Sequence, residues 1–328
     1  MPFFIRDFIR FTRAHEWHPG KMPLMLGFAL TLLLTAPTQQ YGLLWFLMAY
    51  ALTTLFLAAS YMLNNIADKE VDALANKSTG LEGWPRRKLV IPVIIFAALA
   101  FGIGVVLMPI LAICAMIACY ILSWSYSCRP LRFKEHTVLG PFVPAFTQVP
   151  APALVMAVAW GVLPLPALIY LMIVFFYLLR MLFVHHILDY ENDRITGTHT
   201  TAIALGLTAT RRLLYLTFAL ETLCTIIFLI LIVYAGLPKL LLICLAWPLF
   251  LVLLRRIRRE PIQLDSYSYI PLADVHESVI PLILAIGVAM HEGNLMIAAI
   301  PLIVILFLKR HIERLIIPLL GWKDDTDA

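Results

Sequence analysis

Long apolar runs, separated by short polar connections, follow one another along almost the whole chain. Each run approaches the roughly 20 residues that an α-helix needs to cross the apolar part of a bilayer. Such runs predict membrane-spanning helices. We therefore expect an all-α fold, a multi-pass transmembrane helical bundle of nine or ten helices. The predicted spans are residues 22–37, 43–63, 89–108, 110–125, 138–159, 164–186, 212–235, 239–254, 272–291 and 294–308.

The first residues show a different pattern from the spans. Phenylalanine and isoleucine alternate there with Arg6, Arg10 and Arg13. This mixture is typical of an amphipathic helix that lies in the membrane interface, although an ordinary juxtamembrane segment would have the same composition. We expect an interfacial helix over residues 1–21 and a single transmembrane domain over residues 22–328.

Composition excludes a soluble globular protein. Hydrophobic residues make up 62% of the 328 residues and charged residues only 14%, whereas soluble domains carry roughly 25% charged residues. The five cysteines form no Cys-x-x-Cys pair, and four of them lie in apolar spans. We interpret them as free thiols that take part in packing.

Lysine and arginine gather in alternate connections, which predicts the orientation of the chain. They are frequent before the first span and after the second, fourth, sixth and eighth spans, whereas Lys239 is the exception in the opposite connections. By the positive-inside rule, the N-terminus and the basic connections face the cytoplasm or its equivalent. Lys309, Arg310 and Arg314 favour a cytoplasmic C-terminus and ten spans. Nine spans result if one of the last two runs lies in the interface.

Two acidic motifs follow apolar spans directly, on the same predicted side of the membrane. The first places Asn64, Asp68 and Asp72 four residues apart, and the second places Asp189 and Asp193 four residues apart. Side chains at this spacing lie on one helix face, one turn apart, where like charges repel. A cation between them removes this cost, and Mg²⁺ bridged to phosphate oxygens prefers such oxygen ligands. A solvated helix end or polar loop is the alternative for each motif alone.

Basic residues on the same predicted side suit a diphosphate that carries Mg²⁺. The connection SYSCRPLRFK contains Arg129, Arg132 and Lys134, which can bind phosphate oxygens or can serve only as a topology signal. Arg180 lies inside an apolar span, about two turns before Asp189. A charge there is costly unless it faces the bundle interior. Arg180 is therefore a candidate for holding a phosphate or neutralising the acids, with snorkelling to the interface as the alternative.

Four stretches of the chain resemble motifs of the UbiA-type intramembrane prenyltransferases. NNIADKEVD is similar to their NxxxDxxxD motif, and DYENDRITGTHTTAIALG resembles their second motif, DxxxD followed by GxxxT and LG. YSCRPLRFK resembles the YSxPPLRxK connection of the quinone and chlorophyll branches, and FTRAHEW resembles the N-terminal R-x-H-x-W. The stretches occur in the family's order over residues 9–210.

The resemblance implies a bundle around a lipid-accessible cavity, in which both acidic motifs hold Mg²⁺ and a prenyl diphosphate. The four aspartates are then the catalytic carboxylates, and Arg132 and Lys134 contact the diphosphate. Asn65 stands where the family often has Asp, and Arg129 where Pro is common, so these positions depart from the pattern without removing a metal ligand. The implied metal ligands are Asn64, Asp68 and Asp72 for one site, and Asp189 and Asp193 for the other.

The predicted function is Mg²⁺-dependent transfer of a prenyl group within the membrane. The acceptor is a hydrophobic or amphipathic molecule, such as an aromatic compound or quinone precursor. The expected partners are prenyl diphosphate, this acceptor and membrane lipid, with no nucleic acid, and the active site faces the cytoplasm. A terpene cyclase of the same superfamily is one alternative. A cation-coupled transporter is another, although its acids would lie near the bilayer centre in discontinuous helices.

Overall fold

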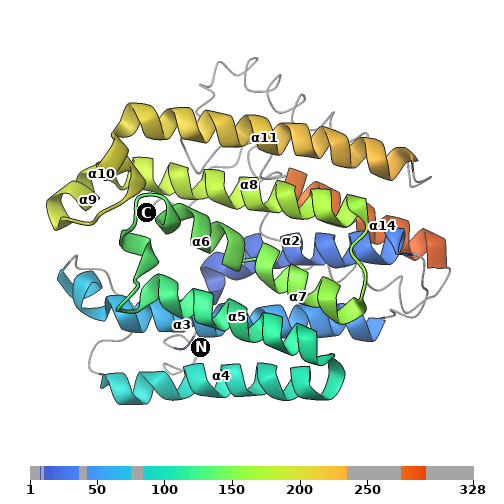
Figure 1. The fold of residues 1–328 in the computed structure, drawn as a ribbon, viewed down its shortest axis with the longest axis horizontal. Coiled ribbons are helices and arrows are strands. Elements are labelled where there is room, and N and C mark those ends of the chain that lie inside the picture. The colour runs from blue at the N-terminus through green and yellow to red at the C-terminus, as the bar shows by residue number, and fades with distance from the viewer. Residues whose placement is uncertain (1–7, 9–10, 37–42, 75–83, 235–274, 293–328) are drawn as a thin grey trace, which may run out of the picture.

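The computed structural model describes residues 8, 11–36, 43–74, 84–234 and 275–292. Within these ranges the chain forms helices and no β-strand, which confirms the predicted all-α fold (Figure 1). The elements are α2 (Ala14–Thr35), α3 (Leu43–Leu74), α4 (Arg86–Leu107), α5 (Ile110–Ser127), the 3₁₀ turn η1 (Phe133–Glu135), α6 (Leu139–Thr147), α7 (Pro150–Trp160), α8 (Leu165–Leu188), α9 (Tyr190–Thr196), α10 (Thr201–Leu205), α11 (Leu207–Tyr234), the π-helix η3 (Val275–Val279) and α14 (Ile280–Glu292).

The described helices coincide with the predicted spans. By length and composition, α3, α4, α5, α8 and α11 can cross a membrane, and the bent pair of α6 and α7 makes a sixth span. Helix α2 and the segment 275–292 cover the first and ninth predicted spans. Helix α2 also runs through the boundary expected between residues 21 and 22. The predicted spans 239–254 and 294–308 lie outside the described residues.

The predicted span 138–159 is bent rather than straight. Helix α6 ends at Thr147, α7 begins at Pro150, and the two helices are bent by 41°. Pro150 has no backbone N–H to donate, and its ring clashes with the preceding helical turn. Because both halves are equally apolar, hydropathy alone did not predict the break.

Proline and glycine set several other helix boundaries. Helix α5 follows Pro109 and α8 follows Pro164, where the fixed φ of proline suits the start of a helix. Helices α7 and α9 are followed by the C-cap residues Gly161 and Gly197, whose φ values of 69° and 68° are left-handed and favour glycine. The short connections that result keep sequential spans antiparallel and adjacent.

Helix α2 lies in the middle of the bundle, against α3, α8 and α14, while α11 packs along α8 and α4 along α3 (Figure 1). In the most apolar 18-residue stretch of α4 only 17% of the residues are buried, whereas 61% are buried in the corresponding stretch of α8. The outer face of α4 is therefore apolar surface suited to lipid. The C-terminal end of α3, the α5–α6 connection and helices α9 and α10 all lie at one end of the bundle (Figure 1).

Candidate active site at one end of the bundle

The first acidic motif lies on one continuous helix, as its spacing predicted. Helix α3 runs through to Leu74, so Asn64, Asp68 and Asp72 follow one another at single-turn intervals. Ser127, the last residue of α5, donates a hydrogen bond of 3.1 Å to Asn64 Oδ1. This bond fixes the direction of the amide oxygen, which keeps a second lone pair for another partner.

Two basic residues of the α5–α6 connection reach the carboxylate of Asp68. The ammonium group of Lys134 pairs with Asp68 Oδ1, and Arg132 Nη2 lies 3.5 Å from the same oxygen. Arg132 is in turn held by Glu135, with 2.6 Å between its Nε and Glu135 Oε1. The structure therefore brings together three of the residues that the sequence assigned to the site.

The surroundings of this ion cluster are sheltered from water. The side chains of Arg132, Lys134 and Asp68 are only 16–18% exposed. Nearby, burial raises the pKa of the Cys128 thiol, an effect that the charge of Lys134 partly opposes. Cys128 therefore stays a neutral thiol at physiological pH, and the charge of the cluster comes from its carboxylate and basic side chains.

The second acidic motif starts at a break between two helices. Asp189 is the cap residue between the end of α8 at Leu188 and the start of α9 at Tyr190. The backbone N–H of Asp193 still donates to the Asp189 carbonyl at 2.8 Å. The two aspartates thus keep the one-turn spacing that the sequence predicted. Asp193 is buried at 9% exposure, and His185 Nε2 lies 3.4 Å from Asp189 Oδ2.

A hydrogen bond links the second motif to the basic connection. Thr201, the first residue of α10, donates from Oγ1 to the carbonyl of Thr137 at 2.8 Å. Both acidic motifs and the basic connection therefore lie at the same end of the bundle (Figure 1). The side chain of Asp72 lies outside the described residues.

The oxygen donors fit a Mg²⁺ ion that also binds phosphate. Within the described ranges, no three His, Cys, Asp or Glu side chains gather closely enough to hold a metal by themselves. Mg²⁺ usually needs only one or two carboxylates, because waters and substrate phosphates complete its octahedron. The amide oxygen of Asn64 and the carboxylate of Asp68 are oxygen donors of this kind, and the cations around Asp68 show that this position stabilises positive charge.

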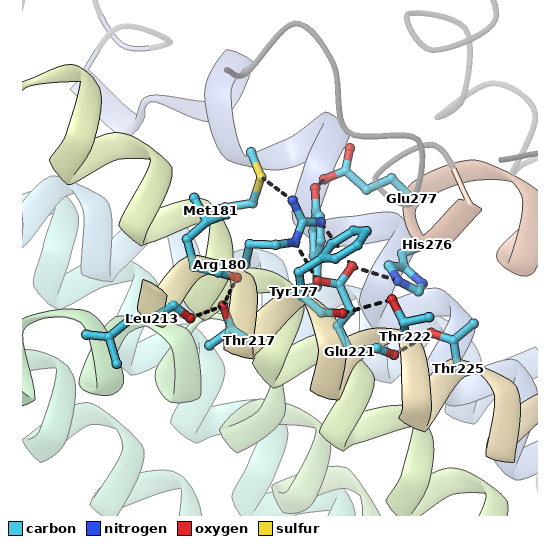
Figure 2. Close-up of polar contacts among 12 residues, drawn as sticks. Tyr177, Arg180, Met181, Leu213, Thr217, Glu221, Thr222, Thr225, His276 and Glu277 are labelled. Carbon is cyan, nitrogen blue, oxygen red and sulfur yellow. Dashed lines mark hydrogen bonds and ion pairs between the residues drawn. The ribbon is translucent and has the colours of Figure 1, made fainter. Parts of the chain in front are cut away.

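Arg180 occupies a separate, fully buried ion cluster (Figure 2). Its Nε and Nη2 donate to the two carboxylate oxygens of Glu221 at 2.5 and 2.9 Å. His276 Nε2 lies 3.0 Å from Glu221 Oε1. Arg180 is 1% exposed, so its side chain faces the bundle interior and does not snorkel. Its role in diphosphate binding stays a prediction, and its guanidinium group is bound here to Glu221.

The same cluster connects four elements of the bundle, namely α2, α8, α11 and η3. Tyr177 of α8 donates a hydrogen bond to Glu277 of η3 (Figure 2). Gly20 of α2 packs against this carboxylate, since a Cβ there would come within 3.1 Å of Glu277 Oε1. Sequence analysis did not assign Glu221, although it is the only acidic residue in the span 212–235. A lone acid within an apolar span was the signal that could have found it.

Asn65, which departs from the family pattern, has a structural partner. Its side-chain amide is 2% exposed and donates to the carbonyl of Phe11 at 2.9 Å. One turn before Asn65 on α3 lies Tyr61, whose ring centroid is 5.6 Å from the Arg13 guanidinium. This distance is within the range of a cation–π contact. Asn65 therefore holds the N-terminal segment on α3.

These features define a multi-pass α-helical membrane protein with an oxygen-rich acidic site and a basic connection at one end of the bundle. Comparison of the sequence with protein-family profiles identifies the family of this chain. The UbiA prenyltransferase family profile matches residues 23–270, and the chain therefore belongs to this family.

Solved structures share this fold. A UbiA homologue from Archaeoglobus fulgidus bound to GPP and Mg²⁺ has 19% sequence identity and a TM-score of 0.61, with 90% of this chain and 99% of that chain covered. A structure of digeranylgeranylglyceryl phosphate synthase has 17% identity and a TM-score of 0.62, covering 87% and 99%. The apo UbiA homologue from Aeropyrum pernix K1 has 16% identity and a TM-score of 0.59, covering 83% and 97%. No curated protein sequence matches the chain significantly.

Proposed function

We propose that the protein transfers a prenyl group from a prenyl diphosphate to a hydrophobic acceptor inside the membrane. The observation that carries this proposal is the sheltered cluster in which Arg132 and Lys134 meet Asp68, one turn from Asn64. A site with carboxylate and amide oxygens beside two cations suits a diphosphate with its metal. Family membership and the homologue that binds GPP and Mg²⁺ support it.

Each group at the site has a proposed role in breaking the carbon–oxygen bond of the diphosphate. The ligands proposed for Mg²⁺ are the first-motif residues Asn64, Asp68 and Asp72 together with Asp189 and Asp193 of the second motif. Bound Mg²⁺ supplies positive charge that stabilises the leaving diphosphate. Arg132 and Lys134 donate hydrogen bonds to the remaining phosphate oxygens, where charge develops as the bond breaks.

The proposed reaction leaves an allylic carbocation for the acceptor to attack. The carbon–oxygen bond breaks and its electron pair leaves with the diphosphate. A carbon or oxygen atom of the acceptor then forms the new bond and loses a proton. Because water would quench the cation, apolar side chains must surround the reacting carbon.

A small cavity marks one direction that the prenyl tail could take. It has a volume of about 20 Å³ and lies between α3, α5 and α7, where Phe56, Met116 and Val155 line it. Along α3, Phe56 lies 12 residues from Asp68, a rise of about 18 Å. Methionine side chains repack easily, so we propose that Met116 shifts to accommodate apolar chains in this direction.

The function is tested by incubating membranes that contain the protein with labelled prenyl diphosphate and Mg²⁺. We expect a labelled product that forms only when an acceptor is present and that contains the acceptor. A cyclic hydrocarbon formed from the diphosphate alone would instead identify a terpene cyclase. Cation movement across sealed vesicles without any labelled product would identify a transporter.

The proposal also places both acidic motifs on the cytoplasmic face. In a cysteine-free background, Glu70→Cys beside the first motif and Thr196→Cys beside the second should react with a membrane-impermeant maleimide from the same side. Leu163→Cys, in the exposed connection before α8, should react only from the other side. Labelling of positions 70 and 196 from opposite faces would contradict a shared site.

A further inference from the structure

The carboxylate of Asp68 already has two cationic partners from one short segment. Lys134 and Arg132 both approach Oδ1, the same oxygen atom. With side chains 16–18% exposed, these groups are poorly screened by water and salt. Another cation that binds this oxygen must therefore displace at least one of them.

A divalent cation and Lys134 compete for Asp68. Mg²⁺ binds carboxylate oxygens at about 2.0–2.1 Å and tolerates little distortion. Its two charges would also repel an ammonium group held at the same oxygen. Binding of the metal at Asp68 thus requires that Lys134 move to a different anionic partner, and the oxygens of a diphosphate are such a partner.

The local structure lets the side chain of Lys134 move while its backbone stays in place. The Lys134 carbonyl packs against Gly140, where a Cβ would come within 3.1 Å of it. Arg132 is restrained separately, by the 2.6 Å contact with Glu135. Lysine carries its charge on a flexible four-carbon chain, whereas the guanidinium fork of arginine is planar and rigid. Lys134 is therefore the mobile cation of the pair.

We propose that Lys134 exchanges between Asp68 and the diphosphate, and thereby makes divalent-cation binding depend on diphosphate binding. Lys134 opposes the metal when it is paired with Asp68 and supports it when paired with the diphosphate. This inference rests on the proposed function in taking Asp68 as a metal ligand and a diphosphate as the substrate. It predicts that loss of the lysine charge tightens binding of the metal alone and weakens binding of the metal in the presence of diphosphate.

The test measures Mn²⁺ binding to the detergent-solubilised full-length protein by equilibrium dialysis, with and without inorganic pyrophosphate. A protein-free chamber corrects for Mn²⁺ bound by pyrophosphate itself. In the parent, pyrophosphate should strengthen Mn²⁺ binding. In Lys134→Met, Mn²⁺ alone should bind about tenfold more tightly, and Mn²⁺ with pyrophosphate about tenfold more weakly, as expected for one charge-assisted hydrogen bond in each state. The gain from pyrophosphate should therefore fall about a hundredfold.

Two control variants separate the exchange from simple electrostatics. Lys134→Arg keeps the charge and should bind Mn²⁺ alone as weakly as the parent. Lys88→Met removes an exposed charge at the start of α4 and should match the parent in both measurements. If Lys134→Met unfolds early in a thermal melt, Lys134→Gln provides the same test.

The outcomes distinguish this inference from the proposed function. Unchanged or weaker binding of Mn²⁺ alone by folded Lys134→Met would overturn the exchange, even if the parent forms prenylated product. If the parent forms no product but Lys134→Met tightens Mn²⁺ binding alone and weakens it with pyrophosphate, the exchange stands and the proposed reaction is overturned. Equal effects of Lys134→Met and Lys88→Met on Mn²⁺ binding would show that Lys134 acts only through the net charge of the protein, and would overturn the exchange.

Discussion

Replacing Asp68 or Asp189 with alanine should lower turnover at least about a hundredfold. Each substitution removes one proposed metal ligand, and the stabilisation of the leaving diphosphate falls when the metal is less firmly held. In Asp68→Ala the two cations Arg132 and Lys134 also lose their shared partner. The measurement is turnover with prenyl diphosphate, Mg²⁺ and acceptor in detergent or nanodiscs.

Glu191→Gln is the matched control for these variants. Glu191 lies between the two aspartates of the second motif, and its exposed side chain pairs with Arg194. An exposed pair of this kind contributes about 0–1 kcal/mol, so Glu191→Gln should retain nearly full turnover. Near-normal turnover in both alanine variants would contradict the assignment of the acidic motifs, whereas equal losses in all three variants would indicate a general effect of charge.

Hydropathy predicted the helices well because a bilayer imposes one length on every span. The spacing of the first motif put its residues on one stripe if the span continued as a helix past Leu63, and α3 does continue to Leu74. The bend between α6 and α7 was not predicted, since it depends on the backbone chemistry of Pro150 within a run that is apolar on both sides of the break. Hydropathy therefore predicts where a span lies along the chain, but it does not predict a break in the helix within that span.

The candidate site was predictable where its chemistry is local. Spacing within each acidic motif was enough to place its members one helical turn apart. The partners of these residues come from distant parts of the chain: Lys134 and Asp68 are 66 residues apart, and Ser127 and Asn64 are 63 apart. No local pattern specifies such pairs. The family resemblance placed Lys134 near the site but gave no indication of Ser127 as the partner of Asn64.

Breaking the buried ion cluster should strongly destabilise the protein. We expect Glu221→Leu or Arg180→Met alone to lower the free energy of unfolding by about 3–5 kcal/mol, because each leaves an unpaired charge in the bundle interior. Both side chains are at most 1% exposed, so water cannot solvate the remaining charge. Thermal unfolding in detergent, followed by circular dichroism, measures the effect.

The double variant Arg180→Met with Glu221→Leu should be clearly more stable than either single variant, since it removes both charges and leaves apolar side chains of similar size. Arg194→Met, which breaks an exposed pair, should change stability by less than about 1 kcal/mol. A double variant as unstable as the sum of the singles would show that the two charges do not act as a pair. The folded double variant also tests the sequence-based role of Arg180, because the Tyr177–Glu277 hydrogen bond still holds η3 after the contact between His276 and Glu221 is lost. Unchanged diphosphate affinity in this variant would assign Arg180 to the stability of the bundle, and weakened affinity would assign it to the diphosphate as well.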